Sequence, residues 1–525
     1  MQAKPKMLVF SHICSPQYVT GAEKLLLFMM RELQPYFNCT LVVPTEGVIA
    51  QQARELGFPV VLQDVPLVVP LYLALPHLND EIEMYQRTPA WASLITLIHQ
   101  EQPNIVLVNT TVHPLPAMAA KMLGIPVVWS AMEAIRFTPD TYRSAALIEQ
   151  FADVVLGISE ATLAPLRTPS LLPRSLLLPP SWNPDEMTPE MWPTFREQRR
   201  SQLGLSDEHL VVGFIAASIF DAKGLDQFMR MAVDVAERFP QAMYLLVGNP
   251  VDSDYFEQCL NVARNAGLMD RFRWVRFEER IETLYPAMDV VVIPSMAAEG
   301  FGMTALEAMV FGKPIVVYGA GGLAEIAQAT GNDMYVARTG DPDGLFTRVC
   351  GLLGDFKRRQ AAGLHNWNAA RAVYGITEYR RKLKTFVQTL AMRGFVPLRL
   401  VKGSGSTVYL YEQGILRPFR SLEALHAAGY TLEEVREVPD SLIVSLPKGP
   451  PIGSRPARAR KARASRLRHR RLRKGRRLRR STKRVIRARR RRRNIGGLLR
   501  RRRRGTLRRR SIKSGRSRRR RSARR

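Results

Sequence analysis

Cysteine is scarce in this chain, and long uninterrupted apolar runs are absent. The four cysteines, Cys14, Cys39, Cys259 and Cys350, lie far apart, without the spacing of a metal site or a disulfide framework. A membrane-spanning helix needs roughly 20 apolar residues, and the longest candidate, 65–78, is cut by three prolines. No secretory leader is visible. These absences argue against a disulfide-stabilised or membrane-spanning protein, and we expect a cytoplasmic one.

Acidic residues are missing from one long part of the chain. Residues 454–525 hold 39 Lys and Arg residues and no Asp or Glu, whereas the rest holds 40 basic and 46 acidic residues. The net charge of +33 therefore belongs to this tail. A block of like charge offers no core, so we expect 453–525 to be disordered and to bind a polyanion through salt-sensitive contacts that read no sequence. An anionic membrane surface, a wall polymer, nucleic acid and a spore component remain alternatives, as does a solubilising role.

The other residues alternate between short apolar runs and helical patterns. The chain's 525 residues, 46% of them hydrophobic, suffice for two domains with separate cores. Strands are predicted at 7–11, 39–43, 60–62, 105–108, 127–129, 154–158 and 176–178, and again at 211–215, 244–247, 272–275, 290–293 and 315–317. Continuous apolar strands between helices are typical of parallel sheets covered on both faces. The sequence thus predicts an α/β protein with two doubly wound, Rossmann-like domains.

A compact motif follows the predicted strand 290–293. Pro294 ends the strand, a helix is expected from about Met303, and Glu299 and Glu307 flank a Gly-x-Gly pair between them. A strand-to-helix turn of this kind leaves backbone N–H groups free beside the positive end of a helix, which suits a phosphate. Carboxylates beside such a site are well placed to accept hydrogen bonds from sugar hydroxyls.

The motif does not stand alone. It is followed by Gly312-Lys313-Pro314-Ile315-Val316-Val317 and by Gly321-Gly322-Leu323-Ala324-Glu325-Ile326, and the whole resembles the retaining glycosyltransferases of family 4. The resemblance covers about residues 7–392 and implies the GT-B architecture, two Rossmann-like domains facing a cleft. It also implies retaining transfer of a sugar from a nucleotide-diphosphate sugar to a glycan or lipid-linked acceptor, without a metal or another cofactor. We expect a role in cell-envelope or surface polysaccharide synthesis.

The resemblance assigns roles to residues of the second domain. It implies that Lys223 clamps the diphosphate, that Glu299 binds the sugar hydroxyls and that Glu307 binds the ribose. The backbone of 300–304 is expected to cradle sugar and phosphate oxygens, where a side chain at Gly302 would crowd the ligand. Further donor contacts are expected from Gly300, Phe301, Gly302, Met303, Thr304, Gly248, Gly21, Ala22 and Ser218, and base contacts from 276–280.

Three departures from the family pattern concern the site. Ser218 stands where many relatives have Arg, Ala22 replaces a second glycine, and Glu133 follows the strand after which many relatives have His. Glu133 is expected to take a catalytic role near the acceptor, with a structural role as the alternative. The acceptor pocket is expected to include Asn109, Thr111 and His113. The departures leave open a degenerate, scaffold-like or spore- or envelope-associated protein held on polyanions by its tail.

These observations predict five parts, listed here in chain order. They are an N-terminal acceptor domain (1–185), a nucleotide-sugar domain (186–365), a helix crossing back (366–395), an accessory module (398–452) and the tail (453–525). In the module we predict a hairpin strand at 401–411, a helix at 422–428 and a strand at 442–445. The module resembles small units of bacterial envelope and surface proteins, and it is interpreted as a binding unit or a spacer. Peripheral attachment to the inner membrane face or to a spore is an alternative to a purely cytoplasmic location.

Overall fold

The computed structural model describes residues 4–453 apart from 277, 279, 396–399, 413–414 and 433–434. The basic tail lies outside the described residues, so its disorder and its binding of a polyanion stay predictions. The described residues form two compact units, 4–406 with 435–445, and 407–432 with 446–453. Both Rossmann-like domains belong to the first unit. Within the described part, no helix is long and apolar enough to cross a membrane.

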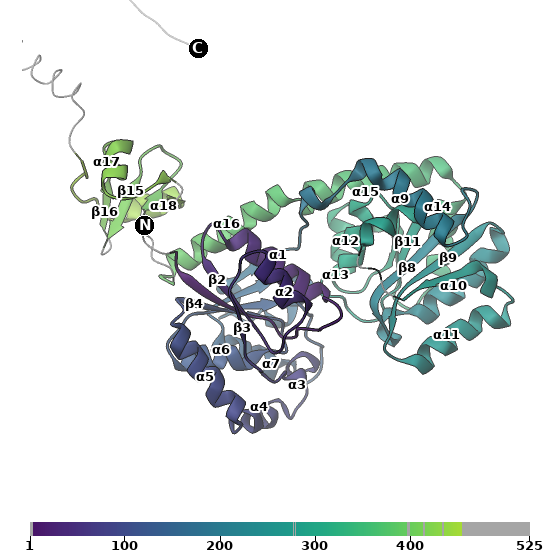
Figure 1. Cartoon of the computed structure of the whole chain (residues 1–525), viewed down its shortest axis with the longest axis horizontal. Helices are drawn as coiled ribbons and strands as arrows, with labels where there is room; N and C mark the ends of the chain where they lie inside the picture. The colour runs from purple at the N-terminus through teal and green to yellow at the C-terminus, as the bar shows by residue number, and fades with distance from the viewer. Residues whose placement is uncertain are drawn as a thin grey trace, which may run out of the picture. The chain divides into compact units, whose positions relative to one another are not determined.

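Seven parallel strands form the sheet of the first domain (Figure 1), in the order β3-β2-β1-β4-β5-β6-β7. Their bounds are β1 Lys6–Phe10, β2 Asn38–Val43, β3 Val60–Leu62, β4 Ile105–Asn109, β5 Val127–Ala131, β6 Val154–Gly157 and β7 Ser175–Leu177. Alternate residues of β1 belong to different apolar clusters, Leu8 to one and Val9 to the other. Both faces of the sheet are therefore covered, as the apolar strands predict.

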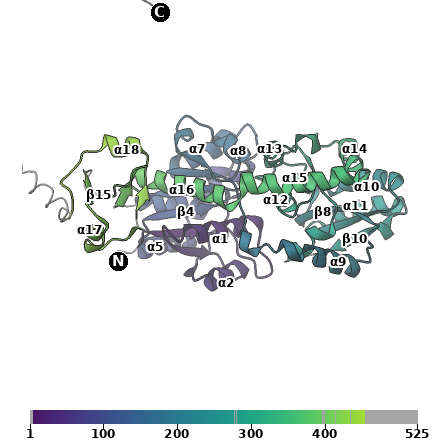
Figure 2. The same ribbon diagram turned by 90° about the horizontal axis from the view of Figure 1, so that it is seen from above.

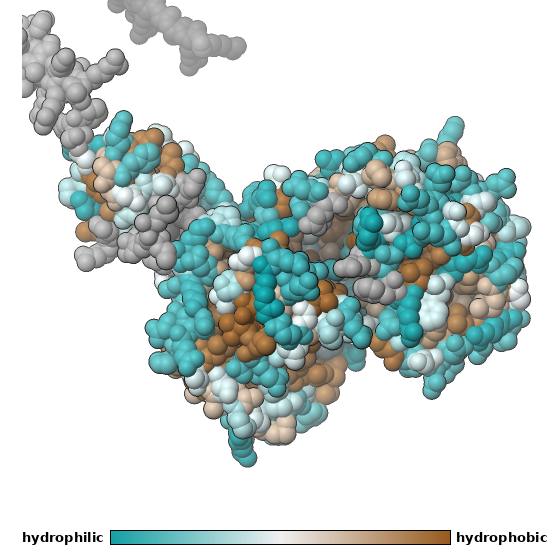
Figure 3. Space-filling model, in the orientation of Figure 1, coloured by the Kyte–Doolittle hydropathy of each residue, from teal (hydrophilic) through white to brown (hydrophobic). Residues whose placement is uncertain are grey.

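Helices connect these strands and cover the two faces. They are α1 Gly21–Leu33, α2 Val48–Glu55, α3 Val69–Leu73, α4 Leu78–Gln86, α5 Pro89–Glu101, α6 Pro114–Met122, α7 Thr141–Phe151 and α8 Glu160–Leu163. The strand order reverses between β1 and β4, and in open α/β sheets ligands bind beyond the carboxyl ends of the strands at such a point. In Figure 3 polar side chains cover much of the visible face, and apolar ones gather over part of this domain.

The second domain repeats the design with six parallel strands in the order β10-β9-β8-β11-β12-β13. The strands are β8 Leu210–Ile219, β9 Ala242–Pro250, β10 Phe272–Val275, β11 Val290–Ile293, β12 Ile315–Tyr318 and β13 Val336–Ala337. The helices are α9 Trp192–Gln202, α10 Leu225–Arg238, α11 Ser253–Asn265, α12 Met303–Val310, α13 Gly322–Ala329 and α14 Pro342–Leu353. The predicted fold class, two doubly wound α/β domains, is confirmed.

The predicted single helical stretch after the second domain is two helices. Helix α15 spans Phe356–Tyr374 and α16 spans Ile376–Met392, with Gly375 between them. Ala370 and Tyr374 pack in the second domain, whereas Leu383 and Phe386 pack in the cluster that covers the first sheet. Figure 2 shows α15 along the second domain and α16 along the first. The break at Gly375 therefore marks the second passage of the chain between the domains.

The segment after α16 differs in two places from the prediction. The expected strand at 442–445 is part of helix α18, Asp440–Ser445. The expected strand at 401–411 is interrupted: β14 Leu400–Lys402 pairs in parallel with β17 Arg436–Glu437, and β15 Tyr409–Glu412 forms a hairpin with β16 Ile415–Pro418. The short helix is found as α17, Leu422–Ala427. Asp440 explains the helix, because its carboxylate accepts bonds from the backbone N–H and hydroxyl of Ser404 and fixes the chain there.

A buried charge cluster fixes α9 against the second sheet. The carboxylate of Asp289 accepts bonds from Arg196 (2.9 Å), Arg200 (2.7 Å) and the N–H of Val211 (2.8 Å). Burial raises the pKa of Asp289, but the two arginines and the Val211 N–H lower it by a larger amount, so the net shift is downward. Arg200 is 2% exposed, and Lys313 also acts on the cluster. One carboxylate thus serves several cations, and the position tolerates no neutral substitute.

We predict that Asp289→Asn lowers the free energy of unfolding by about 3–5 kcal/mol at pH 7, because it leaves buried cations uncompensated. Urea denaturation of both proteins measures the difference. The folded-state pKa of Asp289 is depressed, so its contribution is present above the unfolded pKa of about 3.9 and is lost as the pH falls through the folded value.

The matched control for this prediction is Glu83→Gln. Glu83 pairs with Arg87 at 3.5 Å, and both side chains are largely exposed, so this change should cost less than about 0.5 kcal/mol. Equal effects of the two substitutions would contradict the role given to Asp289.

Candidate functional site

The turn between β11 and α12 is built from backbone. Gly302 precedes the first residue of α12 with φ +101°, and no side chain caps the helix. The first N–H groups of α12 therefore lack a side-chain acceptor, as the sequence predicts for an anion site. The crowding of a ligand expected at Gly302 stays a prediction, and a Cβ there would also lie 2.6 Å from Leu323 Cδ2. Packing against α13 and the positive φ require this glycine.

Lys223 and Glu299 lie together at this turn. The ammonium of Lys223 donates to Glu299 Oε1 at 2.7 Å, and the hydroxyl of Ser295 donates to the same oxygen at 2.7 Å. Both charged side chains are partly exposed, at 29% and 23%. Gly224 makes this possible, because a Cβ at its position would lie 2.0 Å from the carbonyl oxygen of Pro294. Lys223, predicted to bind phosphate, and Glu299, predicted to bind sugar hydroxyls, thus form one ion pair in the structure.

Glu307 lies deeper in the site. Its Oε2 accepts a hydrogen bond from the hydroxyl of Tyr285 at 2.8 Å. Tyr285 is fully buried and stacks on Phe311, with ring centroids 5.2 Å apart and planes at 11°. Burial raises the pKa of Glu307, whereas the charge of Lys24 and the Tyr285 hydroxyl lower it. The structure therefore holds this carboxylate in one orientation, and Lys24 of α1 faces it from the first domain.

The first domain contacts the turn through backbone. A Cβ at Gly300 would lie 2.2 Å from the carbonyl oxygen of Met132 and 3.5 Å from Cα of Glu133. The Glu133 carboxylate accepts a bond from the N–H of Thr111 at 2.8 Å, and burial raises its pKa. Glu133 therefore lies beside the turn between β11 and α12, and its carboxylate is engaged by the loop after β4. Its expected role near the acceptor stays a prediction.

The start of α1 is closed by its own side chains. Thr20 and Glu23 form a capping box, in which Glu23 Oε2 accepts from the N–H and the hydroxyl of Thr20 at 2.8 Å each. Capping is thus sufficient to explain Glu23. At Gly21 a Cβ would meet nothing within 4 Å, so this end of the loop borders open space. The amide of Asn109 donates to the carbonyl of Ala22 at 3.4 Å and ties the loop to β4.

The expected acceptor residues lie at the carboxyl end of β4. Asn109 and Thr111 are fully buried, and His113 is 1% exposed. The ring of His113 meets Phe10 edge to face, with centroids 6.2 Å apart. Burial, and then the neighbouring His12, lower the pKa of His113 to about 3, so its ring is neutral at pH 7. The structure brings these residues together with Glu133.

The edge of the second sheet holds Gly248 and Ser218. A Cβ at Gly248 would lie 2.0 Å from the carbonyl oxygen of Ala216, so the neighbouring strand requires this glycine. Ser218 lies opposite Asn249 across β8 and β9, next to an irregularity in the register. Asn249 accepts a bond from Arg276 Nε at 3.1 Å. A cation therefore lies beside the strand position where Ser218 replaces the expected arginine.

Other predicted residues are placed by packing. Phe301 is 4% exposed and meets Tyr374 of α15 edge to face at 5.2 Å, so it offers only its backbone to a ligand. Met303 and Thr304, in the first turn of α12, are partly buried. Of the predicted base-binding stretch 276–280, residues 277 and 279 lie outside the described residues.

Hydrogen bonds join the two domains beside the turn between β11 and α12. The carboxylate of Glu325 on α13 accepts from the N–H groups of Glu160 and Ala161, at 2.8 and 2.5 Å, at the first turn of α8. The hydroxyl of Ser159 donates to the carbonyl of Gly300 at 2.5 Å. A negative charge from the second domain thus meets the positive end of a helix of the first. Sequence reasoning missed these contacts and that of Tyr285.

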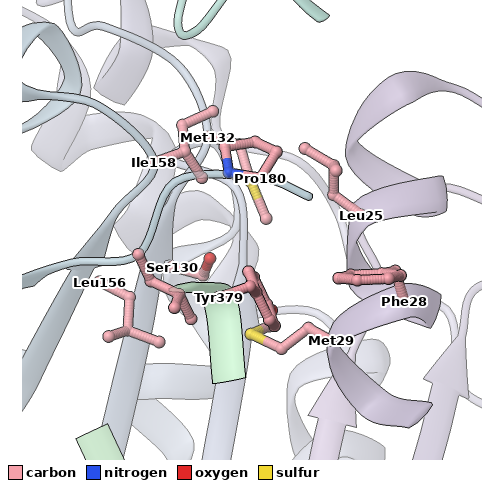
Figure 4. A pocket seen from close by; sticks show the side chains of 10 residues that line it. Leu25, Phe28, Met29, Ser130, Met132, Leu156, Ile158, Pro180 and Tyr379 are labelled. Atoms are coloured by element: carbon pink, nitrogen blue, oxygen red, sulfur yellow. The ribbon is translucent and has the colours of Figure 1, made fainter. Parts of the chain in front are cut away.

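A small apolar pocket lies next to this junction. Figure 4 shows it between α1 and the ends of β5 and β6, with Tyr379 of α16 beside Met29. It is lined by Leu25, Phe28, Met29, Ser130, Met132, Leu156, Ile158, Leu178, Pro180 and Tyr379. None of the predicted donor ligands lines it, so we do not assign it to the nucleotide sugar. Among the described residues, no group of three or more His, Cys, Asp or Glu side chains could hold a metal ion.

Comparison with known proteins agrees with this geometry. Residues 195–363 match the family "Glycosyl transferases group 1". An uncharacterized glycosyltransferase of Methanocaldococcus jannaschii is 31% identical over 163 residues, which are 31% of this chain and 40% of that protein. The D-inositol 3-phosphate glycosyltransferase of Mycobacteroides abscessus is 31% identical over 217 residues, 38% of this chain and 47% of the relative. The chain thus spans less than half the length of these curated relatives.

Solved structures match over most of the chain. The crystal structure of HepE from Anabaena, in complex with UDP and glucose, superposes with a TM-score of 0.61 at 19% identity, covering 74% of this chain and 100% of that one. WaaG, a glycosyltransferase involved in lipopolysaccharide biosynthesis, gives 0.54 at 15% identity, with 73% and 99% covered. The fold is GT-B. The stretch that matches the group 1 family, residues 195–363, lies in the second domain and contains Lys223, Glu299 and Glu307.

We predict that Tyr285→Phe weakens donor binding about tenfold, the equivalent of one hydrogen bond of about 1.4 kcal/mol. The ring keeps its stacking, but Glu307 loses the donor that orients it. Titration calorimetry with nucleotide sugars measures the affinity. In the wild type the Tyr285 hydroxyl lowers the pKa of Glu307, so its removal raises that pKa. As the solution is acidified, Glu307 of the variant becomes protonated at a higher pH, and the variant should lose donor binding at a higher pH than the wild type.

Tyr244→Phe is the matched control for this substitution. Tyr244 is equally buried in the same domain, and its hydroxyl donates to the carbonyl of Ala232 at 2.6 Å, far from the turn in sequence. It should lower stability and leave donor affinity unchanged. Unchanged affinity in Tyr285→Phe would refute the orienting role.

Proposed function

We propose that this chain is a retaining glycosyltransferase that moves a sugar from a nucleotide-diphosphate sugar to a hydroxyl of a glycan or lipid-linked acceptor. The observation that carries the proposal is the turn at 294–302, where an uncapped helix start lies next to the Lys223–Glu299 pair. Backbone N–H groups and an ammonium suit a diphosphate. The family match over 195–363 and the GT-B fold support the same function.

The residues divide the work by charge. Lys223 and the positive end of α12 offset the charge that develops on the departing diphosphate. Glu299 is released from Lys223 when phosphate oxygens take its place, and its carboxylate then accepts bonds from the sugar hydroxyls. Glu307, oriented by Tyr285, accepts bonds from the ribose. In this proposal no metal takes part, because the ammonium and the helix end supply the positive charge.

Retention follows from attack on the face that the diphosphate leaves. The acceptor hydroxyl bonds to the anomeric carbon while the bond to the diphosphate breaks, and a phosphate oxygen takes the hydroxyl proton. This path needs the two domains close together, which the Glu325 and Ser159 contacts supply. We further propose a cytoplasmic role in cell-envelope or surface polysaccharide synthesis, with the basic tail holding the enzyme at a polyanion such as the inner membrane face.

We predict that Glu307→Ala and Lys223→Ala each lower nucleotide release at least about 100-fold, the scale of removing one group that stabilises the transition state. UDP-, GDP- and ADP-sugars are incubated with acceptors, and free nucleotide is measured; circular dichroism confirms folding. The control is Glu257→Ala, which removes an exposed pair with Arg264 and should leave release unchanged. A wild type that binds no nucleotide sugar would instead favour the degenerate scaffold, which Ser218 and the missing His make the second candidate.

A chain ending at residue 453 tests the role of the tail. It lacks the 39 basic residues of 454–525, so its adsorption to anionic vesicles and to DNA at low salt should disappear, while turnover of a soluble acceptor should stay within about twofold. For the full chain, the slope of DNA affinity against salt concentration gives the number of phosphates that the tail neutralises. A folded, shortened chain without turnover would contradict the division into catalytic body and attachment tail.

A further inference from the structure

Unpaired polar atoms gather at one edge of the first sheet. Of eleven buried side-chain atoms without a hydrogen-bond partner in the described part of the chain, six lie after β1, in the first turn of α1, or in and just after the last residue of β4. They are His12 Nδ1, Glu23 Oε1, Asn109 Oδ1, Thr110 Oγ1 and both ring nitrogens of His113. Each such atom costs about 1–3 kcal/mol relative to a paired one. This concentration indicates groups kept for a ligand rather than for the fold.

The backbone is strained at the same place. Thr110 has φ +72°, one of three positive values among the described residues other than glycine. Its N–H donates to the carbonyl of Ser130 at 3.0 Å, and its carbonyl accepts from the indole of Trp129 at 3.0 Å. The surrounding strand therefore holds Thr110 in a conformation that costs about 1–3 kcal/mol, a feature that clusters at binding sites.

The loops at this edge offer almost no positive charge. They are residues 11–20, 44–47, 63–68, 110–113, 132–140 and 158–159. They hold four carboxylates (Glu46, Asp64, Glu133 and Asp140) and one basic residue, Arg136. The guanidinium of Arg136 lies 5.8 Å from the ring of Tyr72. Beside the loops, Arg54 pairs with Glu46 and Arg143 with Asp140. Lys24 and Lys223 act on Glu307 and Glu299 of the donor site.

The starts of helices α1, α6 and α8 do not replace the missing cations. Helix α6 opens with Pro-Leu-Pro, so two of its first three residues have no N–H to donate. The start of α1 is already capped by the Glu23 carboxylate, and that of α8 by Glu325. The imidazoles are neutral at pH 7, because burial lowers the pKa of His12 to about 4 and that of His113 to about 3. An anion buried here would lack compensation.

We propose that this edge is the acceptor subsite and that it selects an uncharged polyhydroxyl group, a sugar or cyclitol without a phosphate. The inference rests on the proposed function and narrows its acceptor. His12 is partly exposed, whereas Thr110 and His113 are buried. A neutral imidazole has one donor and one acceptor, and a threonine hydroxyl has both. These atoms match alcohol groups, which also donate and accept.

The first experiment compares charged and uncharged acceptors. Donor binding is measured first by calorimetry, so that failure of the proposed function is seen on its own. Glucose, mannose, N-acetylglucosamine, myo-inositol and their alkyl ethers or glycosides are then tested beside their monophosphates for faster nucleotide release. At least one neutral alcohol should stimulate release, with a kcat/KM at least tenfold above that of its monophosphate. A better monophosphate, or no stimulation by any neutral alcohol while the donor binds, overturns the inference.

The second experiment tests His113 as a positioning residue. His113→Phe keeps the packing against Phe10 and removes two unpaired nitrogens, so Tm should stay or rise while the acceptor KM rises about tenfold and the donor KM is unchanged. His113→Gln, which can still donate and accept, should recover part of the loss. His209→Phe, in the second domain, is the control. A fall in Tm with an unchanged acceptor KM would show that His113 is structural only and would overturn its role.

Discussion

The backbone of the turn at 294–302 packs directly against the backbone of its neighbours, and the rest of the site depends on this contact. Gly224 brings the Lys223 turn against Pro294, and Gly300 brings the first domain against the same loop. The N–H of Gly322 donates to the carbonyl of Glu299 at 2.8 Å and closes the third side. Any side chain at these glycines would push apart groups that must act on one ligand. The positions of Lys223 and Glu299 are thus fixed by contacts between backbone atoms.

Charge divides the molecule into two halves of different character. The second domain places an ammonium and an uncapped helix start at the turn 294–302, and a buried tyrosine orients Glu307. The acceptor side holds neutral imidazoles, hydroxyls and carboxylates. Under the proposed function, this difference in charge would distinguish the two substrates before any shape is matched.

Much of the fold could be predicted because its signals are local. Strands β3, β10 and β11 have the predicted bounds, since an apolar run reveals its element directly. The motif at 294–309 was found because its strand, glycines and helix are adjacent in sequence. The run 442–445 was misread as a strand, because its apolar, branched residues favour one while the Asp440 contact with Ser404 decides for a helix.

What escaped prediction depends on partners that are distant in sequence. Tyr285 lies 22 residues before Glu307, and nothing in its local pattern indicates a hydrogen bond. Gly302 was recognised, but its packing against Leu323 was not, because Leu323 is a neighbour only in the folded chain. The sequence gives no sign that polar atoms of Thr110 and His113 are unpaired, because the absence of a hydrogen-bond partner is visible only in the folded chain.

Glu325 has a consequence for how the protein can cycle. Its carboxylate accepts two bonds from α8, and breaking each of them costs about 1.5–3 kcal/mol because the acceptor is charged, whereas the neutral bond from Ser159 costs about 0.5–1.5 kcal/mol. These three contacts involve no strand residue of either sheet, and the chain itself joins the domains only near Gly375 and after β7 among the described residues. Any separation of the two domains therefore has to break these bonds first, so the strength of this one junction limits how readily the domains can part.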